Sequence, residues 1–315
     1  MQPVTHSIDT PFPSGPVHCY SFESEDGLIL VDCGLATEEA ERYYSSQSFD
    51  LSRLRHILIT HGHIDHYGMA AWLAARSGAK VYLPHRDYLK SRHLRDYLRI
   101  LGDLMYGMGF DNSYYKSLMK LFNLEQKYAP IPENLLVVEK DLPKNLGVDF
   151  VACPSHSQSD LVYLTDGCAM TGDAVLQGIF QTPTLEVDME QSGRFNNYEA
   201  YCDSMIKLAA LEGRRILPGH CQAPASVREV LLFYVTKLLQ RAERLRPWRN
   251  EANISNIMSE MFAGGKTEAI VVFLKAGEVI FMQDFFREPE RLAASLQHVG
   301  LYDEVKEFYD QALGR

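Results

Sequence analysis

The stretch "LITHGHIDHYG" at residues 58–68 decides how the rest of this sequence is interpreted. It follows an apolar run that predicts a buried strand, and it carries His61, His63, Asp65 and His66. His61 and His63 alternate, so on an extended turn both side chains point one way and can share one ion. Asp65 and His66 lie where the following helix should begin and can serve a second ion. The stretch therefore predicts a metal site at the end of a strand.

Three further candidate ligands occur in the same setting, each directly after an apolar strand. They are His156 in "FVACPSHSQSD", Asp173 in "AMTGDAV" and His220 in "RILPGH". Loops at strand ends are where α/β folds expose chemical groups on a rigid scaffold. The complete set contains five imidazoles and two carboxylates, which suits zinc or another first-row ion.

These residues carry a resemblance to the metallo-β-lactamase fold hydrolases. "GLILVDCG" with Asp32, "THGHIDH", "SHSQSD", "TGD" and "LPGH" occur in the family's order, over about residues 1–222 apart from a helical insertion. The resemblance implies an α/β fold, an αββα sandwich with a dinuclear metal site on one edge. Two divalent ions are expected, with zinc favoured and iron or manganese left open, since one His/Asp set serves all three.

The resemblance also assigns the residues. The ligands fall into two sets and a bridge, namely His61, His63 and His156 for the first ion, Asp65, His66 and His220 for the second, and Asp173 between them. Asp32 is expected to organise the motif loop by hydrogen bonds without touching an ion. Asp65 is also a catalytic candidate, because it could orient the attacking hydroxide or carry a proton to the leaving group.

Outside the motifs, the chain predicts helices. We expect a catalytic domain over 1–222, a helical insertion over 86–134 and a mainly helical extension over 223–315. The segment 268–283 is ambiguous between helix and strand. The insertion either packs on the sandwich or forms a lid, and Tyr106, Phe110 and, beyond Asp173, Phe180 are predicted substrate contacts.

Composition argues against several classes of protein. The net charge of −10 argues against a sequence-independent hold on nucleic acid. No apolar run is long enough for a membrane span, and the N-terminus does not resemble a signal peptide. The six cysteines are scattered, without the density of a disulfide-stapled secreted domain. A cytoplasmic location is therefore expected.

The reaction is less constrained than the metal site, because one fold hosts many chemistries. The motifs look like those of glyoxalase II and related acyl-thioesterases, with Asp160 where those relatives have a second histidine. We therefore expect a metal-bound hydroxide to attack a thioester or ester carbonyl of a small molecule with an apolar acyl group. A phosphodiesterase stays open as an alternative.

A binding or regulatory module that keeps its metals is a second alternative. It would act through a partner or a homodimer, using the leucine-rich segment 230–240 as its surface. The other interpretation of that segment is a helix that packs within the chain. Mutating the metal ligands separates the classes, because an enzyme loses turnover whereas a binder need only keep its fold.

Overall fold

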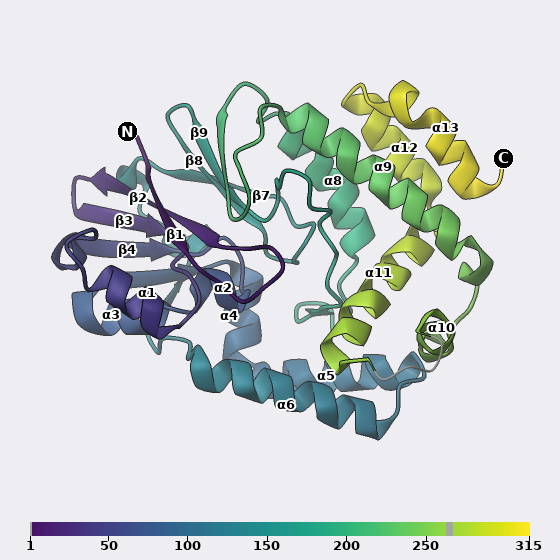
Figure 1. Cartoon of the computed structure of the whole chain (residues 1–315), viewed down its shortest axis with the longest axis horizontal. Helices are drawn as coiled ribbons and strands as arrows, with labels where there is room; N and C mark the ends of the chain where they lie inside the picture. Colours follow the sequence, from purple (N-terminus) through teal and green to yellow (C-terminus); the bar gives the residue numbers. More distant parts are fainter. Residues whose placement is uncertain (1, 263–266) are drawn as a thin grey trace.

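The computed structural model describes residues 2–262 and 267–315, without the side chains of 124–126 and 128. Two β-sheets face each other and helices cover their outer faces (Figure 1). The C-terminal helices form a separate layer on the side of α8 and α9, away from the strands that begin the chain (Figure 1). The expected αββα sandwich with a helical extension is confirmed.

The first sheet contains the strands on both sides of the quoted stretch. Its order is β1-β2-β3-β4-β5-β6, antiparallel from β1 to β3 and parallel from β3 to β6. Its strands are β1 (Val4–Ile8), β2 (Val17–Ser24), β3 (Gly27–Val31), β4 (Leu54–Leu58), β5 (Lys80–Leu83) and β6 (Leu135–Val137). The strands β2 and β3 form an antiparallel hairpin whose turn contains "EDG". The parallel strands bring the carboxyl ends of β3 and β4 to one edge.

The second sheet supplies the remaining motif strands. Its order is β12-β9-β8-β7, with β12 parallel to β9. Its strands are β7 (Asp149–Ala152), β8 (Leu161–Thr165), β9 (Cys168–Gly172) and β12 (Arg215–Pro218), and β10 (Val187–Asp188) pairs with β11 (Gly193–Arg194) separately. Apolar side chains from both sheets, including Ile29, Leu58, Tyr163 and Met170, fill the space between them. This packing fixes the motif loops of the two sheets against each other.

Short helices cover the outer face of the first sheet. They are α1 (Glu38–Tyr44), the 3₁₀ helix η1 (Leu51–Arg53), α2 (Ile64–Tyr67) and α3 (Ala70–Ser77). The Thr37 side chain accepts a hydrogen bond from the Ala40 amide and caps α1. Gly78 ends α3 with φ 72°, a left-handed conformation that suits glycine.

The chain between β5 and β6 is helical. It forms α4 (His85–Arg92), α5 (Leu94–Gly107) and α6 (Asn112–Tyr128), which lie below the sheets in the view of Figure 1. After β6 come the short α7 (Val138–Asp141) and the 3₁₀ helix η2 (Lys144–Leu146). The apolar stripe of α5 buries Tyr97, Leu101 and Met105. The insertion therefore packs through one face and leaves the other to solvent.

The second half of the chain covers the outer face of the second sheet. Its helices are α8 (Asn197–Ala209), α9 (Val227–Leu245), η3 (Arg246–Trp248), α10 (Ile254–Met261), α11 (Ala269–Arg287), α12 (Pro289–His298) and α13 (Tyr302–Leu313). The ambiguous segment 268–283 is helical, and most of α11 is buried. A helix that is apolar on nearly all sides has no clear period in its sequence, which explains the ambiguity. None of the helices in the described part of the chain is both long and apolar enough to cross a membrane.

The leucine-rich segment does not form an exposed surface. Leu231, Tyr234, Leu238 and Leu239 are each at most 2% exposed and pack into the core that α9 shares with α8 and α11. Of the two interpretations of this segment, packing within the chain is the one that holds for these four residues, and they do not form an exposed partner surface. Burying them within one chain stabilises the extension against the sandwich instead.

Candidate metal centre and its cavity

All seven predicted ligands converge at one edge of the sandwich. His61 and His63 follow β4, His156 follows β7, Asp173 follows β9 and His220 follows β12. Asp65 and His66 lie in α2, the four-residue helix that follows the histidine turn. Their side chains form overlapping groups whose candidate ligand atoms lie within 4.8 Å of one another. Five different segments therefore supply one cluster.

The first group is made of three imidazoles. The Nδ1 atom of His63 lies 3.0 Å from Nε2 of His61 and 3.1 Å from Nε2 of His156. A tetrahedral zinc ion with bonds of about 2.0–2.1 Å would hold its ligands roughly 3.3 Å apart. The three nitrogen atoms are thus spaced as ligands of one ion.

The second group is made of Asp65, His66 and His220. Oδ2 of Asp65 lies 3.3 Å from Nε2 of His220, and Oδ1 of Asp173 lies 3.4 Å from Nε2 of His66. The other oxygen of Asp173, Oδ2, lies 3.8 Å from Nε2 of His156 in the first group. Asp173 therefore presents one carboxylate oxygen to each group, as a bridging ligand would.

Hydrogen bonds hold the opposite sides of these imidazoles. Oδ2 of Asp32 accepts a hydrogen bond from Nδ1 of His66 at 2.8 Å, and Asp32 also accepts from the amide and hydroxyl of Thr60 at 2.8 and 2.9 Å. The Thr60 hydroxyl in turn lies 3.1 Å from Nδ1 of His61. A proton held on each Nδ1 leaves Nε2 free to bind an ion.

Two backbone carbonyls likewise hold a proton on Nδ1 of His156 and His220, which leaves Nε2 of each ring free to bind an ion. Nδ1 of His156 donates to the carbonyl of Thr182, and Nδ1 of His220 donates to the carbonyl of Pro16, each at 2.9 Å. Asp32 itself has φ 54°, an uncommon conformation for a side-chain-bearing residue. Such a backbone persists where surrounding contacts impose it, here the three bonds to the carboxylate.

The residues fit divalent ions. Nε2 of His66 and Oδ1 of Asp173 are buried and have no hydrogen-bond partner among the described residues, a costly arrangement unless a cation is bound. Gly219 leaves space beside them, because a Cβ there would lie 2.6 Å from Oδ1 of Asp173. Nitrogen and carboxylate donors together suit borderline first-row ions.

The protonation states of His61, His63 and Asp173 also suit metal binding. Burial, followed by the His156 imidazole, lowers the pKa of His63 to about 3, and burial with neighbouring imidazoles lowers the pKa of His61 further below its usual range. Burial opposes ionisation of Asp173, but the imidazoles of His66 and His220 outweigh it and lower the pKa of that carboxyl. Neutral imidazoles and an ionised carboxylate are the forms that bind ions. Burial opposes protonation of His66 and His220, but the neighbouring carboxylates, Asp173 first for His66 and Asp65 first for His220, outweigh it and raise both pKa values, so these two imidazoles would release a proton when an ion binds.

Two buried acids organise the loop of His156, and sequence reasoning did not assign them. Oδ2 of Asp160 accepts from the amides of Ser155 and Ser157 at 3.0 and 2.9 Å, so Asp160 lies within the loop that presents the ligand. Glu186 accepts from the amide of Gln158 at 2.5 Å. The aspartate at position 160, where the related motif has a histidine, was the feature of the sequence that could have indicated this role. No feature of the sequence indicated a role for Glu186.

A cavity of about 280 Å³ opens onto the metal centre, and we call it the outer chamber. Its wall includes the ligands His63 and Asp65, and most of the remainder is apolar. The other lining residues come from five parts of the chain. They are Phe12; Gly62 and Ile64; Lys90, Tyr97 and Phe122 of the insertion; Thr184, Leu185 and Glu186; and Ile270, Phe273 and Leu274 of α11. Both the insertion and the C-terminal extension thus contribute to the pocket.

The three predicted substrate contacts lie elsewhere. Tyr106 is 44% exposed on α5, Phe110 stacks on Tyr114, and Phe180 packs against Tyr234 beneath Arg241. None of the three is among the residues that line the outer chamber. Their proximity in sequence to the insertion and to Asp173 did not predict which side chains face the ligands.

Comparison with known proteins agrees with this geometry. The family model described as the metallo-beta-lactamase superfamily matches residues 13–220. The probable metallo-hydrolase YqjP of Bacillus subtilis is 24% identical over 262 residues, which cover 78% of this chain and 79% of that protein. The metallo-beta-lactamase fold-containing protein ST1585 of Sulfurisphaera tokodaii is 27% identical over 186 residues, 54% of this chain and 61% of that protein.

Two solved structures share the fold over nearly the whole chain. The metallo-beta-lactamase family protein TTHA1429 of Thermus thermophilus has a TM-score of 0.72 at 19% identity, with 91% of this chain and 94% of that chain covered. A beta-lactamase domain protein from Burkholderia ambifaria has a TM-score of 0.69 at 20% identity, with 90% and 86% covered. At these identities the likeness shows the fold alone.

Proposed function

Because the chain belongs to the metallo-β-lactamase superfamily and is a metal-dependent hydrolase, we propose that it hydrolyses a thioester or ester with an apolar acyl group at a dinuclear centre. The observation that carries this proposal is the outer chamber of about 280 Å³, which opens onto His63 and Asp65 and is otherwise mostly apolar. Zinc is the proposed ion, with iron or manganese as alternatives. The proposed location is the cytoplasm.

Each ligand group would hold one ion. His61, His63 and His156 would hold the first, and Asp65, His66 and His220 the second, with Asp173 between them. Two bound divalent ions lower the pKa of water toward neutrality and polarise a carbonyl oxygen. The chain's own contribution is to fix the ligands through Asp32, Thr60 and the carbonyls of Thr182 and Pro16.

Asp65 is the proposed proton carrier. It lines the outer chamber, and its Oδ2 lies 3.3 Å from Nε2 of His220. Burial opposes its ionisation, but the His66 and His220 imidazoles outweigh burial and lower the pKa of the Asp65 carboxyl. An ionised Asp65 can orient the attacking water and pass a proton to the departing thiol or alcohol.

The apolar wall favours an acyl group over a charged substrate. Ile270, Phe273 and Leu274 of α11 stand on one wall, and the Phe122 ring meets that of Phe273 edge-on at 6.1 Å. Lys90 is the one lysine or arginine among the described residues that line the chamber, and Glu186 adds a buried carboxyl. Burying an apolar acyl chain here contributes about 0.8 kcal/mol for each CH₂ group.

The test is a turnover assay on metal-loaded protein with a panel of acyl-thioesters and an activated phosphodiester, each with and without chelator. We expect chelator-sensitive cleavage of the thioesters. Preference for the phosphodiester would replace the proposed reaction, and bound metal without any cleavage would favour a binding module.

Variants of the predicted ligands test whether the activity depends on the metal centre. His63→Ala and Asp173→Asn should abolish turnover and reduce bound metal. His85→Ala is the matched control, because this histidine lies away from the ligands with Nε2 3.4 Å from Glu190. Equal losses in His85→Ala and His63→Ala would contradict the assigned ligand set.

A further inference from the structure

A second, smaller cavity lies behind the outer chamber, and we call it the inner chamber. Its volume is about 50 Å³, and it shares the wall residues Gly62, Lys90, Tyr97 and Phe122 with the outer chamber. A water-sized group needs about 10–15 Å³ of such space, so the inner chamber has room for roughly four. It is therefore large enough for the end of a chain and too small for a separate substrate.

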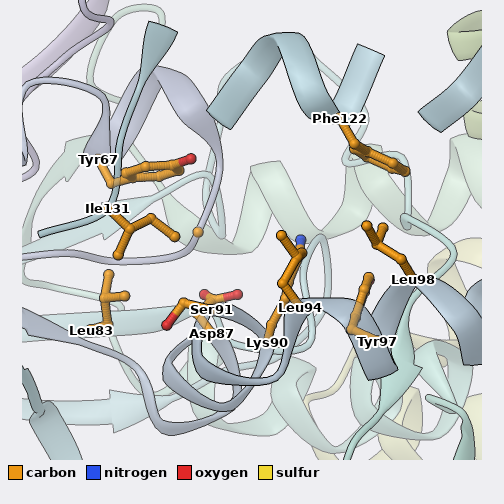
Figure 2. A pocket seen from close by; sticks show the side chains of 11 residues that line it. Tyr67, Leu83, Asp87, Lys90, Ser91, Leu94, Tyr97, Leu98, Phe122 and Ile131 are labelled. Carbon is orange, nitrogen blue, oxygen red and sulfur yellow. The ribbon is translucent and has the colours of Figure 1, made fainter. Parts of the chain in front are cut away.

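The wall of the inner chamber has a polar and an apolar side. Asp87, Lys90 and Ser91 share one face of α4, since residues three and four positions apart are neighbours on a helix. The apolar side consists of Leu83, Leu94, Leu98, Phe122 and Ile131, from β5, α5, α6 and the chain that follows. Figure 2 shows these side chains around the same space, with Asp87 and Ser91 between Leu83 and Leu94.

Asp87 provides an independent indication of a ligand. It is 4% exposed, and its Oδ2 has no hydrogen-bond partner among the described residues. Its carboxyl also lies against Gly62, where an added Cβ would be 2.6 Å from Cγ of Asp87. Burial raises the pKa of the Asp87 carboxyl, while Lys90, the Ser159 hydroxyl and the Gly62 amide, which face it, act in the opposite direction. Leaving Oδ2 of this buried carboxyl without a hydrogen bond of good geometry is costly, so a ligand that brings a donor to it would bind favourably.

From this arrangement we propose that the inner chamber receives the far end of the acyl group, and that this end carries a hydroxyl. The carbonyl would lie at the metal centre, the chain would cross the outer chamber and pass Lys90 and Tyr97, and the terminal hydroxyl would donate to Oδ2 of Asp87. The apolar side from Leu83 to Ile131 would contact the last carbons. This inference rests on the proposed acyl hydrolysis and adds its substrate class, an ω-hydroxyacyl group.

The inner chamber would also limit the length of the acyl chain that the site accepts. Each CH₂ group of an acyl chain that fits is buried, which should raise kcat/KM about fourfold. A chain with more carbons than the two chambers hold cannot keep its carbonyl at the centre. The kcat/KM of a hydroxyacyl substrate of the right length should exceed that of its alkyl analogue of equal length by about tenfold, the effect of one hydrogen bond.

The experiment compares kcat/KM over straight-chain acyl-thioesters from butanoyl to dodecanoyl and over their ω-hydroxy analogues, with metal-loaded full-length protein. Leu94→Phe fills the inner chamber and should shift the best chain length downward and abolish the preference for the hydroxyl. Leu121→Phe is the matched control, because Leu121 is 38% exposed on α6 and lines neither chamber. Melting temperature and metal content verify that both variants fold.

The variant Asp87→Asn tests whether Asp87 binds the hydroxyl of the substrate or only supports Gly62 in the histidine turn. If Asp87 binds the hydroxyl, this variant should lose more on hydroxyacyl than on alkyl substrates of equal length. An equal loss on both series would show that Asp87 only supports Gly62 and would overturn the hydroxyl assignment. An unchanged length profile in Leu94→Phe would overturn the inner chamber as a subsite, although cleavage of thioesters by the wild type would leave the proposed function standing.

Discussion

The hydrogen bond from His66 to Asp32 makes a specific prediction about the second metal ion. The Asp32 carboxylate accepts from Nδ1 of His66, which leaves Nε2 as the free ligand atom. In Asp32→Asn, the side-chain NH₂ group can occupy the position of Oδ2 and donate to Nδ1. The ring proton would then move to Nε2, the atom that has to bind the ion.

The magnitude follows from the contacts that change. Loss of such a carboxylate partner typically weakens metal binding by 10- to 100-fold, or about 1.4–2.8 kcal/mol. Asparagine can keep the bond from the Thr60 amide, and it tolerates the positive φ of this position better than most residues. We therefore expect a folded protein with one weakened metal site.

Metal titration followed by mass spectrometry under native conditions is the suitable assay. The wild type should bind two ions per chain, and Asp32→Asn should lose the second at a chelator concentration that leaves the first in place. Asp26→Asn is the control, since the side chain of Asp26 is about half exposed and 3.9 Å from His56. Two ions bound with wild-type affinity in Asp32→Asn would refute the role of this carboxylate in setting the His66 tautomer.

Three further predictions address stability, the bridging ligand and the chamber. Burial lowers the pKa of His6 to about 4, below the unfolded value of 6.5, so the unfolded state binds more protons between these two pH values. The free energy of unfolding should therefore fall by up to about 3 kcal/mol as the pH drops from 6.5 to 4. The melting temperature of His6→Gln should depend less steeply on pH than that of the wild type, and an equal dependence would contradict this assignment. Gly219→Ala should reduce bound metal and turnover at least tenfold, because its Cβ would lie 2.6 Å from Oδ1 of Asp173 and 2.8 Å from Cε1 of His66; wild-type metal content would show that the backbone gives way instead. Leu274→Ala should raise KM for long acyl-thioesters several-fold with little change in melting temperature, whereas the same change at Val271, exposed on the same helix and outside the chamber wall, should leave KM unaltered.

The C-terminal extension shows where the sequence left alternatives that only the packing resolved. Its leucines in α9 were candidates for a partner surface, yet four of these side chains are buried within the chain. The segment that became α11 had no clear period, because a helix buried on most sides has apolar residues all around. Neither outcome is encoded locally, since both depend on what packs against the helix.

The sequence by itself predicted which side chains the structure brings together at the candidate metal centre. His61, His63, Asp65 and His66 are close in the chain, and each remaining ligand follows an apolar strand, so the carboxyl ends of the strands bring them to one edge. Tertiary structure alone decided what faces those ligands. The chamber wall joins Phe12, Phe122 and Phe273, which lie far apart in the chain, and the Asp87 carboxyl of α4 lies against Gly62 of the histidine turn. Strand ends follow from local periodicity, whereas the wall of a cavity depends on how distant helices pack, which periodicity does not specify.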